Sequence, residues 1–321
     1  MVRILQQLSA VLVPGAGGEA GIGAIKSLKL AHFKGEIIAT DANPLSAGLF
    51  LASSSVVMPK SSDEKQFLEK LFDIIRKKKI QVLMPTSQTD GYVYSKHRSE
   101  IEELGAIPVI SEVESMDTCI DKKLTFSKLS QKFPLPFTTT DPDKIHAFPA
   151  IAKPRFGKGS RDIFLVENES DLKYVLSKVG KKEMIFQEYL PGKEYTVDVL
   201  SDLEKNPLMA VPRVRLETRG GISSKGKVVH DEDLQMECMK IASTVGISGP
   251  CCIQMKESKD GGLKLVEINP RLGGGSYLAT LAGANFPAMV IDIALGKPVL
   301  VPSFSEITVV RYFEEIIVKN R

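Results

Sequence analysis

The residues that decide the fold run from Gln254 to Ser276 and read Gln-Met-Lys-Glu-Ser-Lys-Asp-Gly-Gly-Leu-Lys-Leu-Val-Glu-Ile-Asn-Pro-Arg-Leu-Gly-Gly-Gly-Ser. Apolar residues recur in Cys251–Met255 and in Leu263–Ile268, on either side of an Asp260-Gly261 pair that is typical of a tight turn. This pattern predicts a β-hairpin followed by a glycine-rich loop.

The predicted hairpin carries three oxygen-bearing side chains on one face. Glu267 and Asn269 are two residues apart in the second strand and therefore point the same way. With the turn at Asp260-Gly261, Gln254 lies opposite Glu267; with the turn one residue later, Gln254 lies opposite Asn269. Such hard oxygen ligands suit Mg²⁺, whose remaining charge would be balanced by nucleotide phosphates. The alternative is a hairpin with a polar outer face.

The loop after the hairpin favours an anion. Arg271 supplies a positive charge, and Gly273, Gly274 and Gly275 leave backbone N–H groups free to face a negative one. A plain glycine-rich turn is the alternative interpretation of these residues.

The composition is that of an ordinary globular protein. The chain has 321 residues, of which 43% are hydrophobic and 25% charged, enough for two or three packed domains. Its 42 basic and 39 acidic residues give a net charge of +3 without a basic stripe, so nucleic acid is not an expected partner. We find no signal-peptide pattern and no run near the roughly 20 apolar residues that cross a bilayer. We therefore expect a cytoplasmic protein that does not bind membranes.

The four cysteines fit a reducing compartment. Cys251 and Cys252 are adjacent in a predicted strand and point to opposite faces, and the other two are Cys119 and Cys238. Their spacing matches no zinc motif, and the four scattered histidines do not complete one.

Residues 1–115 predict a Rossmann-like parallel α/β domain, because short apolar runs alternate with amphipathic helical stretches from Ala10 onward. The turn Gly15–Gly23, with Asp41 ending the second strand, is similar to a dinucleotide site. Close strand-to-helix packing, or contact with another small molecule, explains a single such turn better. The expected strands are 11–14, 37–41, 82–85 and 108–111, and the expected helices are 22–34, 64–78 and 92–104.

A second unit begins after the Pro134-Leu-Pro136 break, where the pattern changes to paired strands with tight turns. It contains a basic hairpin tip of the kind that closes over nucleotide phosphates. A strand follows this tip instead of a helix, which excludes a Walker A loop; an exposed surface hairpin explains the tip equally well. The residues of the tip are Lys153, Gly157, Lys158, Gly159 and Ser160.

A Pro-Gly turn within Gln187–Glu194 brings two carboxylates to one crossover between strands. Backbone groups there suit the recognition of adenine, and Glu194 suits ribose hydroxyls. The alternative is a solvent-exposed acidic turn.

The order of these features resembles the ATP-grasp superfamily. Lys122, the basic tip, the Glu188–Glu194 crossover and the Gln254–Arg271 hairpin follow one another as the nucleotide-binding blocks of that superfamily do. Within the superfamily, the motifs most resemble those of the biotin carboxylase and carbamoyl phosphate synthetase group and of the related single-chain carboxylate-amine ligases. The chain departs from carbamoyl phosphate synthetase in having one such unit and no glutaminase segment. It also lacks the long C-terminal extension of biotin carboxylases.

The resemblance implies a two-lobed α+β ATP-grasp domain over residues 116–321, with a nucleotide-lid lobe at about 122–190 and a metal-binding lobe at about 191–321. It implies ATP and Mg²⁺ as cofactors, with Mn²⁺ as an alternative ion. The implied ATP-binding residues are Lys122, Lys153, Gly157, Lys158, Gly159, Ser160, Glu188, Tyr189, Leu190 and Glu194. The implied metal ligands are Gln254, Glu267 and Asn269, and the implied catalytic residues are Arg271 and Lys153.

The resemblance further implies an ADP-forming ligase, in which ATP converts a small-molecule carboxylate to an acyl phosphate that an amine attacks. Thr86–Asp90, at the end of an N-terminal strand, are candidates for selectivity. Candidates for holding the acid or its acyl phosphate are Arg213, Arg215, Arg219, Gly274 and Ser276.

Three other classes remain open: an ATP-dependent kinase or carbamoyl-phosphate-synthetase-like phosphate-forming subunit, an NAD-dependent dehydrogenase built on Gly15–Gly23, and a non-catalytic ATP-sensing subunit. A homodimer is the default oligomeric state.

Overall fold

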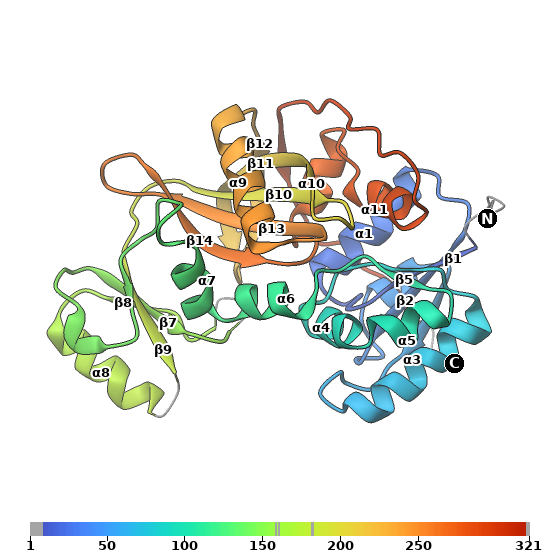
Figure 1. Ribbon diagram of the computed structural model, residues 1–321, viewed down its shortest axis with the longest axis horizontal. Coiled ribbons are helices and arrows are strands. Elements are labelled where there is room, and N and C mark those ends of the chain that lie inside the picture. Colours follow the sequence, from blue (N-terminus) through green and yellow to red (C-terminus); the bar gives the residue numbers. More distant parts are fainter. Residues whose placement is uncertain (1–8, 158, 160, 181–182, 319–321) are drawn as a thin grey trace.

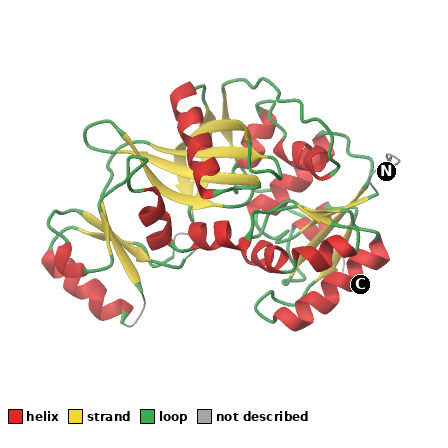
Figure 2. Ribbon diagram, viewed as in Figure 1, coloured by secondary structure: helices red, strands yellow, loops and turns green. Residues whose placement is uncertain are grey.

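The structure is a computed structural model that describes residues 9–157, 159, 161–180 and 183–318 (Figure 1). A parallel sheet and a small antiparallel sheet lie at opposite ends of the long axis, and a six-stranded antiparallel sheet lies between and above them. Figure 2 shows the helices distributed around these sheets. The architecture confirms the expected fold class, a parallel α/β unit followed by a two-lobed α+β unit.

The N-terminal sheet has the order β3-β2-β1-β4-β5, and all of its strands are parallel. Alternate residues of β1 enter two different cores, one on each face of the sheet. The strands are β1 (Ala10–Val13), β2 (Glu36–Asp41), β3 (Ser54–Val57), β4 (Val82–Leu83) and β5 (Ile107–Pro108). The helices are α1 (Glu19–Leu30), α2 (Gly48–Leu51), α3 (Glu64–Lys78), α4 (Gln88–Lys96), α5 (Arg98–Glu103) and α6 (Val113–Ile120).

Two helix predictions in this region need correction. The helix expected over 22–34 begins at Glu19 and ends at Leu30. The single helix expected over 92–104 is wrong, because the backbone leaves the helical conformation at His97 and divides it into α4 and α5. Ser87 also starts α4 earlier than expected, since its side chain accepts a hydrogen bond from the N–H of Asp90.

The glycine-rich turn after β1 allows close packing. A Cβ atom on Gly21 would lie 2.7 Å from the carbonyl oxygen of Gly15, and one on Gly48 would lie 2.2 Å from that of Ala16. The turn also binds Asp41, whose carboxylate accepts a hydrogen bond from the N–H of Gly17 at 2.8 Å. These contacts agree with the packing interpretation of the turn.

The small antiparallel sheet has the order β6-β9-β7-β8 and packs against α8. The helix α7 (Lys122–Leu129) precedes it and packs against α6. The boundary that we expected near residue 115 falls inside α6. The remaining elements are β6 (Thr138–Thr139), the 3₁₀ turn η1 (Pro142–Lys144), β7 (Ala150–Pro154), β8 (Phe164–Val166), α8 (Glu169–Val179) and β9 (Met184–Glu188).

The large antiparallel sheet has the order β14-β13-β10-β11-β12-β15. Its apolar face packs against α9 (Glu232–Val245), and its other face carries the polar residues described below. Its strands are β10 (Glu194–Ser201), β11 (Pro207–Arg219), β12 (Ile222–Val228), β13 (Gly249–Glu257), β14 (Leu263–Asn269) and β15 (Ile307–Val310). Two further helices follow β14, namely α10 (Ser276–Leu281) and α11 (Phe286–Ala294).

The β13–β14 hairpin has the expected pairing at its polar end and a different turn. Gln254 lies opposite Glu267, as one of the two predicted registers requires. The two-residue turn is wrong, because the strands are joined by the longer loop 258–262, and a β-bulge near Val266 restores the register. Ser258 shapes this loop, since its backbone N–H and its hydroxyl both donate to the carbonyl of Gly262.

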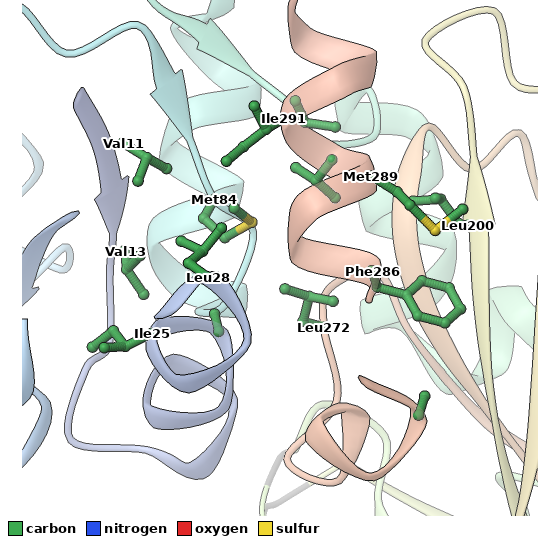
Figure 3. Close-up of a cluster of buried hydrophobic side chains, with 14 of the residues drawn as sticks. Val11, Val13, Ile25, Leu28, Met84, Leu200, Leu272, Phe286, Met289 and Ile291 are labelled. Carbon is green, nitrogen blue, oxygen red and sulfur yellow. The ribbon is translucent and has the colours of Figure 1, made fainter. Parts of the chain in front are cut away.

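One apolar core joins the N-terminal sheet to the C-terminal helices. Val11 and Val13 of β1 face α1, and Phe286 of α11 reaches toward Leu200 of β10 (Figure 3). The N-terminal unit therefore shares its core with the large lobe instead of standing apart. Within the described residues, no helix is both long and apolar enough to span a bilayer.

Candidate active site

A row of polar side chains crosses the large sheet on the face opposite α9. Glu267 of β14 pairs with Gln254 of β13, Gln254 pairs with Thr196 of β10, and Thr196 pairs with Arg213 of β11. Directly opposed residues in antiparallel strands share a face, so these four side chains point to the same side. Asn269 belongs to the next row on that face, because it lies two residues beyond Glu267.

This polar face lines a cavity of about 510 Å³ between the large sheet and the N-terminal unit. All three predicted metal ligands line it, together with Arg271 and the loop Gly273–Gly275. The N-terminal unit contributes the turn at Gly15–Ala20 and the segment Thr86–Thr89. We call this space the reaction cavity.

The three predicted metal ligands offer oxygen atoms with few competing partners. Glu267 forms a long ion pair with Lys122, at 3.7 Å. The side-chain amide of Gln254 has no partner among the residues that the structure describes, whereas the Asn269 oxygen accepts from Arg271 at 3.2 Å. Within those same residues, no group of three or more His, Cys, Asp and Glu side chains is placed to hold a metal. The donor set therefore fits a hard cation that takes its other oxygens from a phosphorylated ligand.

Lys153 on β7 is one of the few buried lysines, with 5% of its surface exposed. Its ammonium donates to the carbonyl of Val266 at 3.3 Å, so the bulge in β14 supplies the acceptor. Burial lowers the pKa of Lys153 to about 8, nearby Lys122 lowers it further, and Glu267 opposes the shift.

Lys122 is placed by a salt bridge behind it. Asp121 caps α7 through the N–H of Lys123 and binds Arg155 through two hydrogen bonds of 2.8 and 2.6 Å. This bridge holds the pKa of Asp121 below its usual range. Lys122 then donates to the carbonyl of Gly157 at 3.3 Å, which links the helix to the basic hairpin tip.

A second cavity, of about 330 Å³, lies between the small lobe and the large sheet, and we call it the nucleotide cavity. Gly159 lines the reaction cavity instead, and Lys158 and Ser160 lie outside the described residues. The predicted ATP-binding residues that line the nucleotide cavity are Lys122, Lys153, Gly157, Glu188, Tyr189, Leu190 and Glu194.

The two predicted base- and ribose-contacting carboxylates are held by cations of the large sheet. Glu188 pairs with Lys264 of β14 at 2.8 Å, and Glu194 pairs with Arg215 of β11. Arg215 lines both cavities, and its Nε atom is buried without a hydrogen-bond partner in the described part of the chain. These ion pairs fix both carboxylates in place.

The residues predicted to hold the substrate fall into different environments. Arg213 is 2% exposed and makes a bidentate pair with Asp198 at 2.6 and 3.1 Å. The Ser276 hydroxyl donates to the same carboxylate at 2.6 Å and accepts from the N–H of Gly273 at 2.8 Å. Both side chains therefore hold the glycine loop in shape.

Arg219 and Gly274 complete that predicted set. Arg219 is exposed and pairs with Glu217 on its own strand, and it lines neither of the two cavities described above. Gly274 lines the reaction cavity. Among the described residues, the backbone N–H groups of Gly274 and Gly275 make no hydrogen bond, so they are free to face an anion.

Sequence reasoning missed Asp198 and Thr196. Both lie on the polar face of β10, where they alternate with the buried Val197 and Val199. A carboxylate in an otherwise apolar alternating strand was the available signal.

Family models match most of the chain in two parts. The model described as "PylC-like, N-terminal domain" matches residues 11–110, and the model described as "ATP-grasp in the biosynthetic pathway with Ter operon" matches residues 180–316.

Two curated relatives and one solved structure illustrate the similarity. D-aspartate ligase of Enterococcus faecium (strain Aus0004) is 23% identical over 282 residues, which cover 75% of this chain and 66% of that protein. The carbamoyl phosphate synthase large chain of Clostridium perfringens (strain SM101 / Type A) is 28% identical over 167 residues, which cover 47% of this chain and 15% of that protein. The chain thus spans just under two thirds of the first relative and a small part of the second.

The biotin carboxylase of Campylobacter jejuni, solved as a β,γ-ATP complex, shares the fold. It superposes with a TM-score of 0.71 at 18% identity, and the match covers 92% of this chain and 72% of that one.

Proposed function

The chain belongs to the ATP-grasp superfamily, and we propose that it is an ADP-forming ligase that joins a small-molecule carboxylate to an amine. The observation that carries this proposal is the common wall between two cavities. Gln254 and Glu267 line both the nucleotide cavity and the reaction cavity. A phosphoryl group at this wall would be within reach of a nucleotide on one side and an acceptor on the other. The D-aspartate ligase among the relatives, a ligase by name, supports the same reaction class.

The residues at this wall and beside it fit a divalent cation. Gln254, Glu267 and Asn269 would hold Mg²⁺, or Mn²⁺ in its place, and the ion would neutralise phosphate charge when bound. Lys122 and Lys153 would bind phosphate oxygens from the nucleotide side, while Glu194 would accept hydrogen bonds from the ribose. The nucleotide would thereby be held with its terminal phosphate at Glu267.

Two bond exchanges make up the proposed reaction. A substrate carboxylate oxygen bonds to the γ-phosphorus, and the bond from that phosphorus to the bridging oxygen breaks, so ADP leaves. The amine nitrogen then bonds to the acyl carbon, phosphate leaves with the acyl oxygen, and the nitrogen loses a proton. Arg271 and the free N–H groups of Gly274 and Gly275 are placed to stabilise the acyl phosphate. No nucleophilic side chain is required, because binding and electrostatics perform the catalysis.

The test measures ADP release over a matrix of carboxylic acids and amines with Mg²⁺, and identifies the product by mass spectrometry. We expect release that needs both an acid and an amine, with one amide formed per ADP. Glu267→Gln should reduce the rate by about 10²–10³, the cost of one preorganised electrostatic group. Glu204→Gln, in the exposed turn before β11, is the matched control and should keep the wild-type rate.

Two outcomes would contradict the proposal. A phosphorylated acid that accumulates as the final product, with no use of amine, would indicate a kinase. Release of ADP at the same rate without any acid would show that the reaction cavity does not hold the acceptor.

A further inference from the structure

The N-terminal unit contains a third cavity, of about 820 Å³, which neither step above uses. It lies where β2 and β4 end, and α3, α4 and α6 contribute to its walls. Ligands of parallel α/β sheets bind at the carboxyl ends of the strands, so the position is that of a binding site. The volume is sufficient for a molecule larger than a simple amino acid.

The floor of this cavity includes Thr40, a buried residue whose hydroxyl has no partner among the described residues. Thr40 of β2 is 2% exposed and lines the cavity. It lies on the same face of the sheet as Ile38, which packs with Phe67 and Val93, and those two residues also line the cavity. Its hydroxyl makes no hydrogen bond within the described residues and is not one of their fully buried unpaired atoms, so it is open to the cavity and can take a partner. A polar atom of a ligand would supply one.

Two carboxylates at the cavity lack a compensating cation. Asp41 accepts hydrogen bonds from the backbone N–H of Gly17 and of Asn43, and Asp117 accepts one from the Tyr92 hydroxyl at 2.8 Å. In the part of the chain that the structure describes, neither forms an ion pair. Glu64, which also lines the cavity, is already compensated by Lys96 and His97.

The remaining wall is apolar over much of its extent. It includes Met58, Phe67, Val93 and Ile120. Lys60 is the one lysine or arginine that lines the cavity among the described residues. The chemistry of the wall therefore suits an aliphatic stem that ends in a positively charged group.

The cavity opens toward the site of phosphoryl transfer. Gly15 and the segment Ser87–Thr89 line both this cavity and the reaction cavity. A ligand that extends from Asp117 to this shared wall would place its other end beside the acyl phosphate.

We propose that this cavity binds the amine substrate, and that this substrate is an aliphatic amine with a second, cationic nitrogen. The inference rests on the proposed ligase function. The charged nitrogen pairs with Asp117, the stem contacts the apolar wall, and the reacting nitrogen lies at the wall shared with the reaction cavity.

Titration calorimetry on the full chain without ATP tests the site, with 1,5-diaminopentane as the probe. Pentylamine lacks the second charge, and 1,5-pentanediol lacks both charges at the same length. We expect the diamine to bind most tightly and the diol not to bind. Asp117→Asn keeps an acceptor for Tyr92 and removes the charge, and it should weaken diamine binding by about tenfold.

The matched control is Glu114→Gln, which removes a carboxylate from the same helix at a side chain that is 89% exposed and does not line the cavity. It should leave the affinity for the diamine unchanged. Thr40→Val keeps the shape and should weaken binding of all amines alike. Each variant should unfold at the melting temperature of the wild type, which establishes that it is folded.

Equal affinity for the diol and the diamine would overturn the inference, and so would equal losses in Asp117→Asn and Glu114→Gln. Its failure is distinguishable from failure of the ligase proposal. If the diamine does not bind but an amine without a second charged nitrogen supports acid-dependent ADP release, the ligase stands and this assignment is wrong. If the diamine binds through Asp117 but no acid and amine pair releases ADP, the cation site stands and the ligase is wrong.

Discussion

At the scale of single residues, Lys153 combines burial with a place in the wall of the nucleotide cavity. Its ammonium donates to the carbonyl of Val266, lies near enough to Glu267 for that carboxylate to raise its pKa, and lines the nucleotide cavity. Burial disfavours the charged form, which is why the pKa of Lys153 falls to about 8. An incoming polyphosphate would favour the charged form again. If Lys153 binds phosphate as proposed, it does so at neutral pH and loses that ability in alkaline solution.

We predict that kcat/KM for ATP falls as the pH rises through about 8, because this ratio reports ionisations of the free enzyme. Above that pH the fall should approach about tenfold per pH unit, since only the protonated fraction binds phosphate. Lys153→Arg keeps its charge throughout this range and should remove the alkaline fall. The profile is measured from pH 6.5 to about 9.5, with the exposed Lys193→Arg as control. An unchanged fall in Lys153→Arg would assign the ionisation to another group.

The same shift predicts how stability depends on pH. The folded-state pKa of Lys153 lies below the ordinary value of 10.5, so between about 8 and 10.5 the unfolded chain binds more protons. The contribution of this residue to the free energy of unfolding therefore rises with pH across that interval. Activity and this part of the stability should change in opposite directions, as expected when a buried charge serves function at a cost to folding.

At the scale of elements, the glycine loop depends on a buried ion pair behind it. Arg213 and Asp198 are almost fully buried, and Ser276 ties the loop to their carboxylate. A Cβ atom on Gly275 would lie 2.3 Å from Nη1 of Arg213, whereas one on Gly274 would meet Glu19 at 3.4 Å. The arginine cannot move aside easily, because its two hydrogen bonds to Asp198 fix it.

We predict that Gly275→Ala lowers the free energy of unfolding by about 1–3 kcal/mol, the usual cost of overpacking. Gly274→Ala should stay within about 0.5 kcal/mol of the wild type, because the added methyl group has room. Urea denaturation of the two variants measures the difference. Equal losses in both would show that Arg213 yields, and that the loop is not built on the Arg213–Asp198 pair.

The hairpin shows what could be predicted from sequence at this scale. Alternation placed Glu267 and Asn269 on one face, because the pleat has a period of two. One of the two expected turn positions paired Gln254 with Glu267, which is the pairing in the structure. The length of the loop and the bulge at Val266 could not be predicted, since both depend on contacts of Ser258 and Lys153 that lie outside any periodic pattern. The predicted turn was too short, yet the bulge compensates for the difference.

The site could be predicted to a similar depth. The order of the motifs predicted that Lys122, Lys153, Glu188 and Glu194 belong to one site, and all four line the nucleotide cavity. Their individual roles remain predictions. The partnership of Arg213 with Asp198 was not foreseen, because the register of β10 against β11 follows from the tertiary fold. For the same reason the cavity beside Thr40 has no signature in the sequence.

At the scale of the whole molecule, the three sheets do not have equally independent cores. The small lobe has an apolar cluster of its own, which includes Phe186. The N-terminal sheet instead shares a cluster with β10, α10 and α11, in which Phe286 is fully buried (Figure 3). The reaction cavity lies beside this shared core, so the two parts that line it are held together by apolar packing. We therefore expect the small lobe to be the part that opens separately.

We therefore predict that the same substitution, Phe→Ala, has different consequences in the two cores. Phe286→Ala should lower the free energy of unfolding by about 3–5 kcal/mol. It should also raise hydrogen exchange in both β1 and β10, because the space left by the ring lies in the core that the two strands share. Phe186→Ala should remove a similar apolar contact but raise exchange only within β6–β9 and α8. Mass spectrometry of exchange under native conditions measures both patterns. If Phe286→Ala increases exchange in β10 and leaves β1 protected, the N-terminal unit folds independently. The reaction cavity would then lie between two separately stable bodies, and its shape would depend on the ligand that joins them.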